Sequence, residues 1–63
     1  MCRINTDDIA KGSVVIINGE HWDVVTSQLV GTSYRVDTDS QSGSGQGIFC
    51  LPAGTVIEGY EPS

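Results

Sequence analysis

The dipeptide Asn18-Gly19, which lies between two β-branched runs, constrains the fold of this chain more than any other feature. The first run is Val14-Val15-Ile16-Ile17, and the second begins at Trp22 and includes Val24 and Val25. Both turn residues tolerate the positive φ of a type I′ turn, and Asn-Gly between apolar runs is the strongest short-range hairpin signal. The sequence therefore predicts an antiparallel hairpin and an all-β fold.

The length of 63 residues allows one domain, residues 1–63. A chain of this length buries only about 60% of the surface that its unfolded form exposes, so disulfides, a metal or oligomerisation often add stability. Cys2 and Cys50 could form at most one bridge, and a secreted domain of this size usually has more cysteines. We therefore expect free thiols, with Cys50 a small core residue in the apolar run 48–51.

Targeting signals are not evident in the sequence. No long apolar segment precedes Ile16, and no stretch approaches the roughly 20 apolar residues that a membrane span needs. We therefore expect a cytoplasmic protein with no membrane partner.

The chain is acidic, with eight Asp and Glu residues, three Lys and Arg residues and a formal net charge of −5. A protein that binds a phosphate backbone needs several cations on one face, which Arg3, Lys11 and Arg35 cannot supply. The charge disfavours direct nucleic-acid binding and favours a partner with a basic surface. The alternative is that the negative charge only keeps a small domain soluble.

The other segments alternate between short apolar runs and turn residues. Residues 1–5 are expected to be flexible or to pair at a sheet edge, and residues 6–12 to form one helical turn with a Thr or Asp cap. Strands are expected at about 13–18, 21–29, 34–39, 48–51 and 55–60, with a flexible Gly/Ser loop at 40–47. This pattern predicts a small five-stranded antiparallel SH3-like barrel with one short helical turn near the N-terminus.

Side-chain alternation predicts the two faces of these strands, because successive residues of a strand point to opposite sides. Inward positions are predicted for Trp22, Val24, Thr26, Tyr34 and Val36, and outward positions for Arg35, Asp37 and Asp39. Residues 14–17 lack polar alternation, so both faces of that strand are expected to meet other protein, either in a barrel or in a homo-oligomer.

A metal site is not supported by the spacing of the candidate ligands. Asp37, Asp39 and Gln41 match the first three positions of a helix-loop-helix calcium loop. The sixth position should be Gly and is Ser42, and the twelfth should be Glu and is Ile48. Zinc would need four ligands, usually including closely spaced cysteines. We expect no metal site.

The sequence does not support a catalytic site or a nucleotide-binding site either. His21 lies near Glu20 and Asp23, and a cysteine could serve as nucleophile, but nothing in the spacing favours such a site. The glycines of residues 43–47 do not lie between a strand and a long helix, and no Lys follows them. We expect no enzymatic activity and no cofactor.

Protein recognition is the remaining hypothesis. Outward carboxylates beside an exposed aromatic residue can engage a basic surface on another protein. The candidate partner-binding residues are Asp23, Tyr34, Asp37, Asp39, Glu58, Tyr60 and Glu61. The alternative is a solvated acidic surface with both tyrosines in the core.

Three segments share the pattern of a known family: Ile-Asn-Thr-Asp-Asp-Ile-Ala-Lys-Gly at 4–12, the turn around 18–20, and Trp-Asp-Val-Val-Thr-Ser-Gln-Leu-Val at 22–30. They resemble the start of the N-terminal KOW-type barrel of bacterial elongation factor P. In that family a Lys-bearing loop that carries the functional modification follows, and then a basic strand. Here Gly31-Thr32-Ser33-Tyr34 and an acidic strand follow instead. The resemblance therefore implies the barrel fold and not the family's activity.

The overall layout also resembles the small single-domain barrels of phage and mobile-element proteins. Its elements are Lys-Gly-x-x-Val-x-Ile-x-Gly, then Trp-x-Val, a polar loop and Leu-Pro-Ala-Gly-Thr-x-Ile. This resemblance implies a phage-encoded inhibitor or accessory factor that binds a basic host-protein surface in the host cytoplasm. The alternatives are a nucleic-acid- or ribosome-associated KOW-like barrel and a structural component of a virion or oligomeric assembly.

Overall fold

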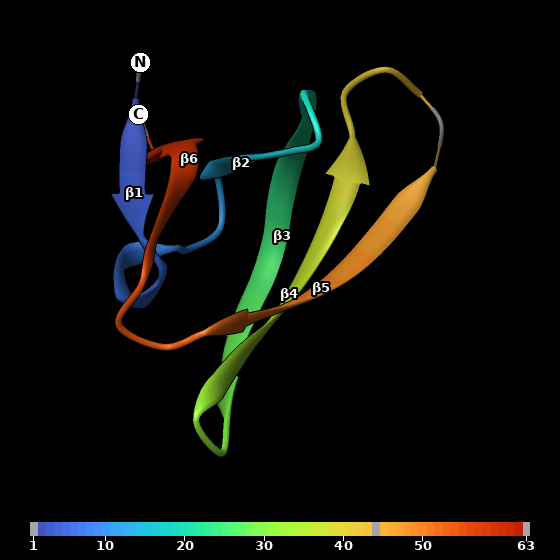
Figure 1. Ribbon diagram of the computed structural model, residues 1–63. Helices are drawn as coiled ribbons and strands as arrows, with labels where there is room; N and C mark the ends of the chain where they lie inside the picture. The colour runs from blue at the N-terminus through green and yellow to red at the C-terminus, as the bar shows by residue number, and fades with distance from the viewer. Residues whose placement is uncertain (1, 44, 63) are drawn as a thin grey trace.

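Six antiparallel strands form one sheet in the computed structural model, which describes residues 2–43 and 45–62 (Figure 1). The elements in chain order are β1 (Arg3–Asn5), the 3₁₀ turn η1 (Thr6–Asp8), β2 (Val14–Ile17), β3 (Glu20–Val30), β4 (Ser33–Ser40), β5 (Gln46–Pro52) and β6 (Val56–Tyr60). The order across the sheet is β1-β6-β2-β3-β4-β5. The predicted all-β class is confirmed. The predicted five-stranded closed barrel is wrong, because there is a sixth strand and the edge strands β1 and β5 do not pair with each other.

The additional strand is β1, which pairs with β6 at the opposite end of the chain. Ile4 lies opposite Ile57 and is buried in the core. Of the two alternatives expected for residues 1–5, the described part pairs at a sheet edge, and Met1 lies outside the described residues. Three residues give too short an alternation to be recognised as a strand from sequence alone.

The predicted Asn-Gly hairpin is confirmed. Asn18 has φ 51° and Gly19 has φ 79°, so both turn residues adopt the left-handed conformation of a type I′ turn. The turn joins β2 to β3 in a continuous register that runs from Ile17 opposite Glu20 to Val14 opposite Asp23.

The single helical turn near the N-terminus is the 3₁₀ turn η1, and its cap differs from the prediction. Asn5, and not a Thr or Asp, caps the turn: its side-chain oxygen accepts a hydrogen bond from the Asp7 backbone N–H at 2.9 Å. Thr6 is fully buried, and its hydroxyl donates instead to the Pro52 carbonyl at 2.8 Å. This bond holds η1 against the end of β5.

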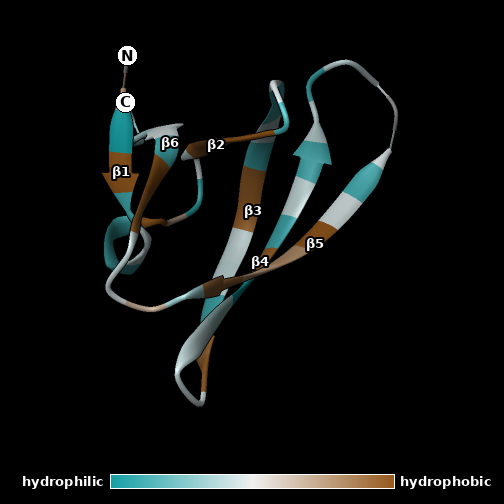
Figure 2. Ribbon diagram, in the orientation of Figure 1, coloured by the Kyte–Doolittle hydropathy of each residue, from teal (hydrophilic) through white to brown (hydrophobic). Residues whose placement is uncertain are grey.

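The core lies on one face of the sheet, its inner side. Its buried apolar members are Ile4, Ile9, Val15, Val24 and Val36, with Ile17, Trp22, Tyr34, Leu51 and Ile57 partly buried against them. The Trp22 ring meets Phe49 edge-on, with 5.1 Å between ring centroids. Figure 2 shows hydrophobic residues on β2 and in the middle of β3. On β2 only Val15 is fully buried and the rest are half-buried, so the outward side of β2 is partly covered.

A β-bulge at Val25 reverses the alternation of β3. Val24 lies opposite Thr38, but Thr26 lies opposite Asp37, so Val25 is an extra residue in β3. Beyond the bulge, Ser27 takes the inward position opposite Val36 and Thr26 is exposed. The prediction that Thr26 shares the inward face of Trp22 and Val24 is therefore wrong.

Strand alternation also corrects the position of Cys50. On β5, Phe49 and Leu51 are half-buried on the inner side, and Cys50 between them is exposed on the outer side opposite Arg35. The prediction that Cys50 is a core residue is wrong. Cys2 and Cys50 are both free thiols at the surface.

Strands extend into both ends of the predicted Gly/Ser loop at 40–47. Ser40 belongs to β4, and β5 begins at Gln46, so the connection covers 41–45, in which Ser44 lies outside the described residues. No helix in residues 2–43 or 45–62 is long and apolar enough to cross a membrane.

Candidate functional site

Four of the predicted recognition residues lie on the outer face of the sheet. Asp23 on β3, Asp37 and Asp39 on β4 and Tyr60 on β6 all occupy positions that point away from the core. We call the surface that these four residues define the acidic face.

One row of side chains crosses the acidic face from β6 to β5. Tyr60 lies opposite Val14, Val14 opposite Asp23, Asp23 opposite Asp39, and Asp39 opposite Gln46. Directly opposed side chains on antiparallel strands have Cβ atoms about 4.5–5.5 Å apart, and like charges in such positions repel. The Asp23–Asp39 pair is therefore a locally unfavourable arrangement. Gln41 compensates part of it by donating its Nε2–H to Asp23 Oδ1 at 2.7 Å.

Asp37 is held by two neighbours on the same face. One of its carboxylate oxygens accepts a hydrogen bond from the Thr26 hydroxyl at 3.0 Å, and the other lies 3.6 Å from Arg35 Nε. The hydrogen bond exists because the bulge turns Thr26 outward. The Arg35 and Asp37 side chains are 54% and 41% exposed, although Asp37 Oδ1 itself is buried, and such largely exposed pairs contribute only about 0–1 kcal/mol, so the pair fixes orientation more than stability.

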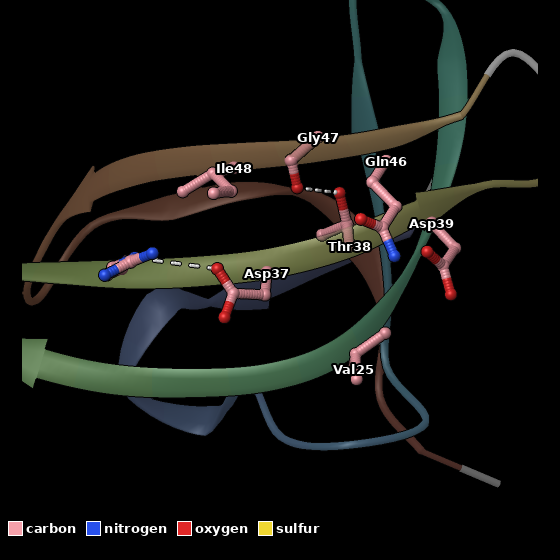
Figure 3. Close-up of a pocket in the computed structure, with 8 residues that line it drawn as sticks. Val25, Asp37, Thr38, Asp39, Gln46, Gly47 and Ile48 are labelled. Carbon is pink, nitrogen blue, oxygen red and sulfur yellow. Dashed lines mark hydrogen bonds and ion pairs between the residues drawn. The ribbon is translucent and has the colours of Figure 1, made fainter.

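A hollow of about 280 Å³ lies between the carboxylates and two exposed apolar side chains (Figure 3). Val25 on β3 and Ile48 on β5 flank Asp37 and Asp39 on β4, and they are 42% and 59% exposed. The Thr38 hydroxyl donates to the Gly47 carbonyl at 2.7 Å and is not available to a ligand. A Lys or Arg side chain suits this hollow, because its aliphatic stem can pack on apolar surface while its charged head meets carboxylates.

Tyr60 ends the row with an exposed aromatic ring. Its ring stacks on that of His21, with centroids 6.3 Å apart and planes inclined by 19°. Tyr60 itself is 44% exposed, so a partner can contact its ring. His21, the one histidine of the chain, thus lies against an aromatic ring. In the described part of the chain, no group of three or more His, Cys, Asp or Glu side chains could hold a metal ion.

The other three predicted residues lie outside this row. Tyr34 lies on the inner side, where a hydrogen bond to the Asp7 side chain, together with desolvation, raises its pKa. Glu58 shares the outer side of β6 with Tyr60, two residues along the strand, but it lies opposite Arg3 on β1 and outside the row that crosses to β5, and Glu61 follows the end of β6.

Sequence reasoning missed the apolar and amide side chains that accompany the carboxylates. Alternation along β5 could have placed Ile48 outward beside Asp37. The contact of Gln41 with Asp23 depends on the β3–β4 register, and the bulge at Val25 has no Gly or other sequence signal.

Comparison of the chain with protein-family models, curated proteins and solved structures found no match. The resemblance to the elongation factor P barrel therefore stays a prediction.

Proposed function

We propose that the acidic face binds a basic surface of another protein. The observation that carries this proposal is the direct opposition of Asp23 and Asp39 across β3 and β4. Two carboxylates in this position repel each other in the free protein. A Lys or Arg side chain of a partner would relieve this repulsion, so part of the binding free energy would come from removing it.

The hollow beside the pair supports the same partner chemistry. Val25 and Ile48 can accept the aliphatic stem of a basic side chain whose head group reaches Asp37 or Asp39. Tyr60 offers an aromatic contact at the other end of the row. A partner surface that itself contacts nucleic acid has the required charge, and the role would then be that of an inhibitor or accessory factor.

The positions of the three basic residues favour a protein partner over a nucleic acid. Arg3 lies on β1, Lys11 in the segment before β2, and Arg35 on β4 beside Asp37. Basic side chains dispersed over three segments do not form the basic patch that phosphate binding requires.

Self-association through the acidic face is disfavoured, because it would bring the carboxylates of one copy against those of the other.

Capture from a cell lysate tests the proposal. The immobilised protein should retain a set of proteins enriched in basic isoelectric points, and added salt should release them. Asp37→Asn/Asp39→Asn should reduce this capture at least threefold. The matched control, Asp8→Asn/Glu61→Gln, has the same net charge and leaves the acidic face intact, so it should capture normally.

Equal loss in both double variants would show that only the overall charge matters and would contradict the proposal. A parallel titration with fluorescently labelled RNA separates the main alternative. Salt-sensitive RNA binding by the wild-type protein would favour the nucleic-acid-associated barrel instead.

A further inference from the structure

Strand β5 leaves one edge of the sheet open. It is the last strand in the order, pairs only with β4 among the described strands, and has seven residues without a charged side chain. Natural proteins usually protect sheet edges with charged side chains, very short strands or covering segments. The opposite edge follows that rule, because β1 has only three residues and includes Arg3.

The hydrogen bonds that flank β5 show which of its backbone groups point outward. Ser40 N–H donates to the Gly45 carbonyl at 2.8 Å, and Ala53 N–H donates to the Thr32 carbonyl at 3.0 Å. Hydrogen-bonded and non-hydrogen-bonded pairs alternate along an antiparallel ladder. In this register, Gly47, Phe49 and Leu51 therefore face β4 through their backbone groups.

The backbone N–H and C=O groups of Ile48 and Cys50 then point to the open edge. Pro52 occupies the next outward position, where the absence of an N–H costs no ladder bond. Its carbonyl already accepts hydrogen bonds from the hydroxyls of Thr6 and Thr55, so the open part of the edge ends near Cys50.

The side chains along this edge define the chemistry of the strand that could join it. Ile48 and Cys50 point to the outer face, where Ile48 lies directly opposite Asp37. A strand added beside β5 would lie about 9.5 Å from β4, two strand spacings away. The side chains of Lys or Arg can span most of that distance toward Asp37 and Asp39.

We propose that an extended segment of the partner, with Lys or Arg at every second residue, adds to the sheet as an antiparallel seventh strand beside β5. This inference rests on the proposed function, because the same carboxylates attract the segment. A second copy of this chain is a poorer occupant. If two β5 strands paired, the Asp37 and Asp39 carboxylates of both copies would lie near the same interface and would repel each other.

Capped heptapeptides of alternating lysine and valine test the proposal by NMR titration of the ¹⁵N-labelled full chain. In antiparallel pairing, the peptide residues that bond Ile48 and Cys50 share their outer face and are the lysines. Methylation of the lysine backbone nitrogens should therefore weaken binding at least tenfold, whereas methylation of the valine nitrogens should change it less than threefold. The amide signals of Ile48 and Cys50 should shift on binding.

A matched pair of protein variants tests whether the peptide binds at the β4–β5 end of the sheet. Ile48 and Val56 are 59% and 57% exposed, so a lysine should be tolerated at either position. Ile48→Lys should abolish binding of the unmodified peptide, because it puts a positive charge on the proposed edge. Val56→Lys, on β6, should bind within threefold of the wild-type protein.

The outcomes separate this inference from the proposed function. If Asp37→Asn/Asp39→Asn weakens binding but both methylated peptides bind equally, the acidic face binds and the strand addition is wrong. If an alternating glutamate–valine peptide binds as well as the lysine peptide, both proposals are wrong. A dimer in sedimentation that persists with excess lysine–valine peptide and is lost in Ile48→Lys would assign the edge to a second copy and overturn the inference.

Discussion

Two glycines inside strands show how differently the two ends of the sheet are built. A Cβ atom on Gly59 of β6 would lie 2.4 Å from the Val14 backbone oxygen and 2.9 Å from Ile4 Cγ2. A Cβ atom on Gly47 of β5 would lie 3.0 Å from Trp22 Cζ3 and 3.2 Å from Phe49 Cε2, which are both side-chain atoms.

The difference divides the sheet into two parts: β1, β6 and β2, where the backbones are tightly packed, and β3, β4 and β5, where side chains fill the space between the strands. At Gly59, strand β6 packs closely against the backbone of β2 and a side chain of β1. A larger residue at position 59 could be accommodated only if one of these strands shifted. Around Gly47, the nearest atoms belong to two aromatic side chains, and a small rotation of a ring is expected to cost less than the shift of a strand. The acidic face and the open edge belong mainly to the β3–β4–β5 part, where substitutions at the surface should change binding and leave the fold intact.

The largest expected effect comes from exchanging the two glycines for alanine. Gly59→Ala should lower the free energy of unfolding by about 3 kcal/mol or more, because a strand must move to accommodate the new atom. A chain of this length has a total stability of roughly 3–9 kcal/mol, so this loss would remove at least a third of it and would unfold the variant at the lower end of the range. Gly47→Ala should cost about 1 kcal/mol. Urea unfolding followed by tryptophan fluorescence measures both.

Equal losses in the two glycine variants would contradict the division of the sheet. In that case the rings of Trp22 and Phe49 would be as immobile as the backbone of β2.

Adjacent valines on β3 extend the comparison to the strand where the two parts meet. Val24 is 3% exposed in the core, and Val25 is the exposed bulge residue. Val24→Ala should cost about 2 kcal/mol through lost burial and a cavity. Val25→Ala should stay within about 0.5 kcal/mol. Thermal unfolding by circular dichroism measures both, and a large loss at Val25 would mean that this residue is packed and not free for a partner.

Substitutions of Thr6 and Thr55 test the contact between η1 and the end of β5, because the hydroxyls of both residues donate to the Pro52 carbonyl. The buried Thr6 hydroxyl also accepts the Thr55 N–H at 3.3 Å. Thr6→Val should cost about 1 kcal/mol, since Thr55 still satisfies Pro52 and only the Thr55 N–H loses its partner. Thr55→Val, at an exposed position, should cost less. A larger loss at Thr55 than at Thr6 in urea unfolding would reverse this assignment.

The smallest effect concerns pH. A hydrogen bond to the Asp7 side chain is the main cause that raises the pKa of Tyr34 above its ordinary value of 10.0. The folded protein therefore holds the Tyr34 proton more tightly than the unfolded chain. The resulting stabilisation is complete below pH 10 and is lost as the pH rises through the raised pKa.

Tyrosinate absorbance in a Tyr60→Phe background reports Tyr34 alone. Asp7→Asn should lower the pKa of Tyr34, and Asp8→Asn, which acts only through its charge, should lower it less. An unchanged titration in Asp7→Asn would show that Asp7 does not hold this hydroxyl.

Local patterns predicted much of the fold, because most of its strands are set by neighbours in sequence. The Asn18-Gly19 turn and the inward positions of Val24, Tyr34 and Val36 follow from turn chemistry and alternation. Strand β1 and the open edge depend on pairings between distant segments. The bulge at Val25 inserts one residue without a sequence signal, and this reversed the predicted position of Thr26.

The candidate site was predictable to a similar extent. Alternation placed Asp37 and Asp39 outward, but only the β3–β4 register shows that Asp39 opposes Asp23. Tyr34 shows the limit of composition: alternation already pointed it inward, and its inclusion among the recognition residues rested on its aromatic character.

The pairing of β1 with β6 has a consequence for the order of folding. The hairpins β2–β3, β3–β4 and β4–β5 each join neighbouring segments, whereas Ile4 must find Ile57 across nearly the whole chain. Closing so large a loop has a high entropic cost that only the assembled core can offset. We therefore expect a folding chain to form the meander of β2 to β5 first, with both of its edges unprotected. The pairing of β1 with β6, around the tightly packed Gly59, would form last.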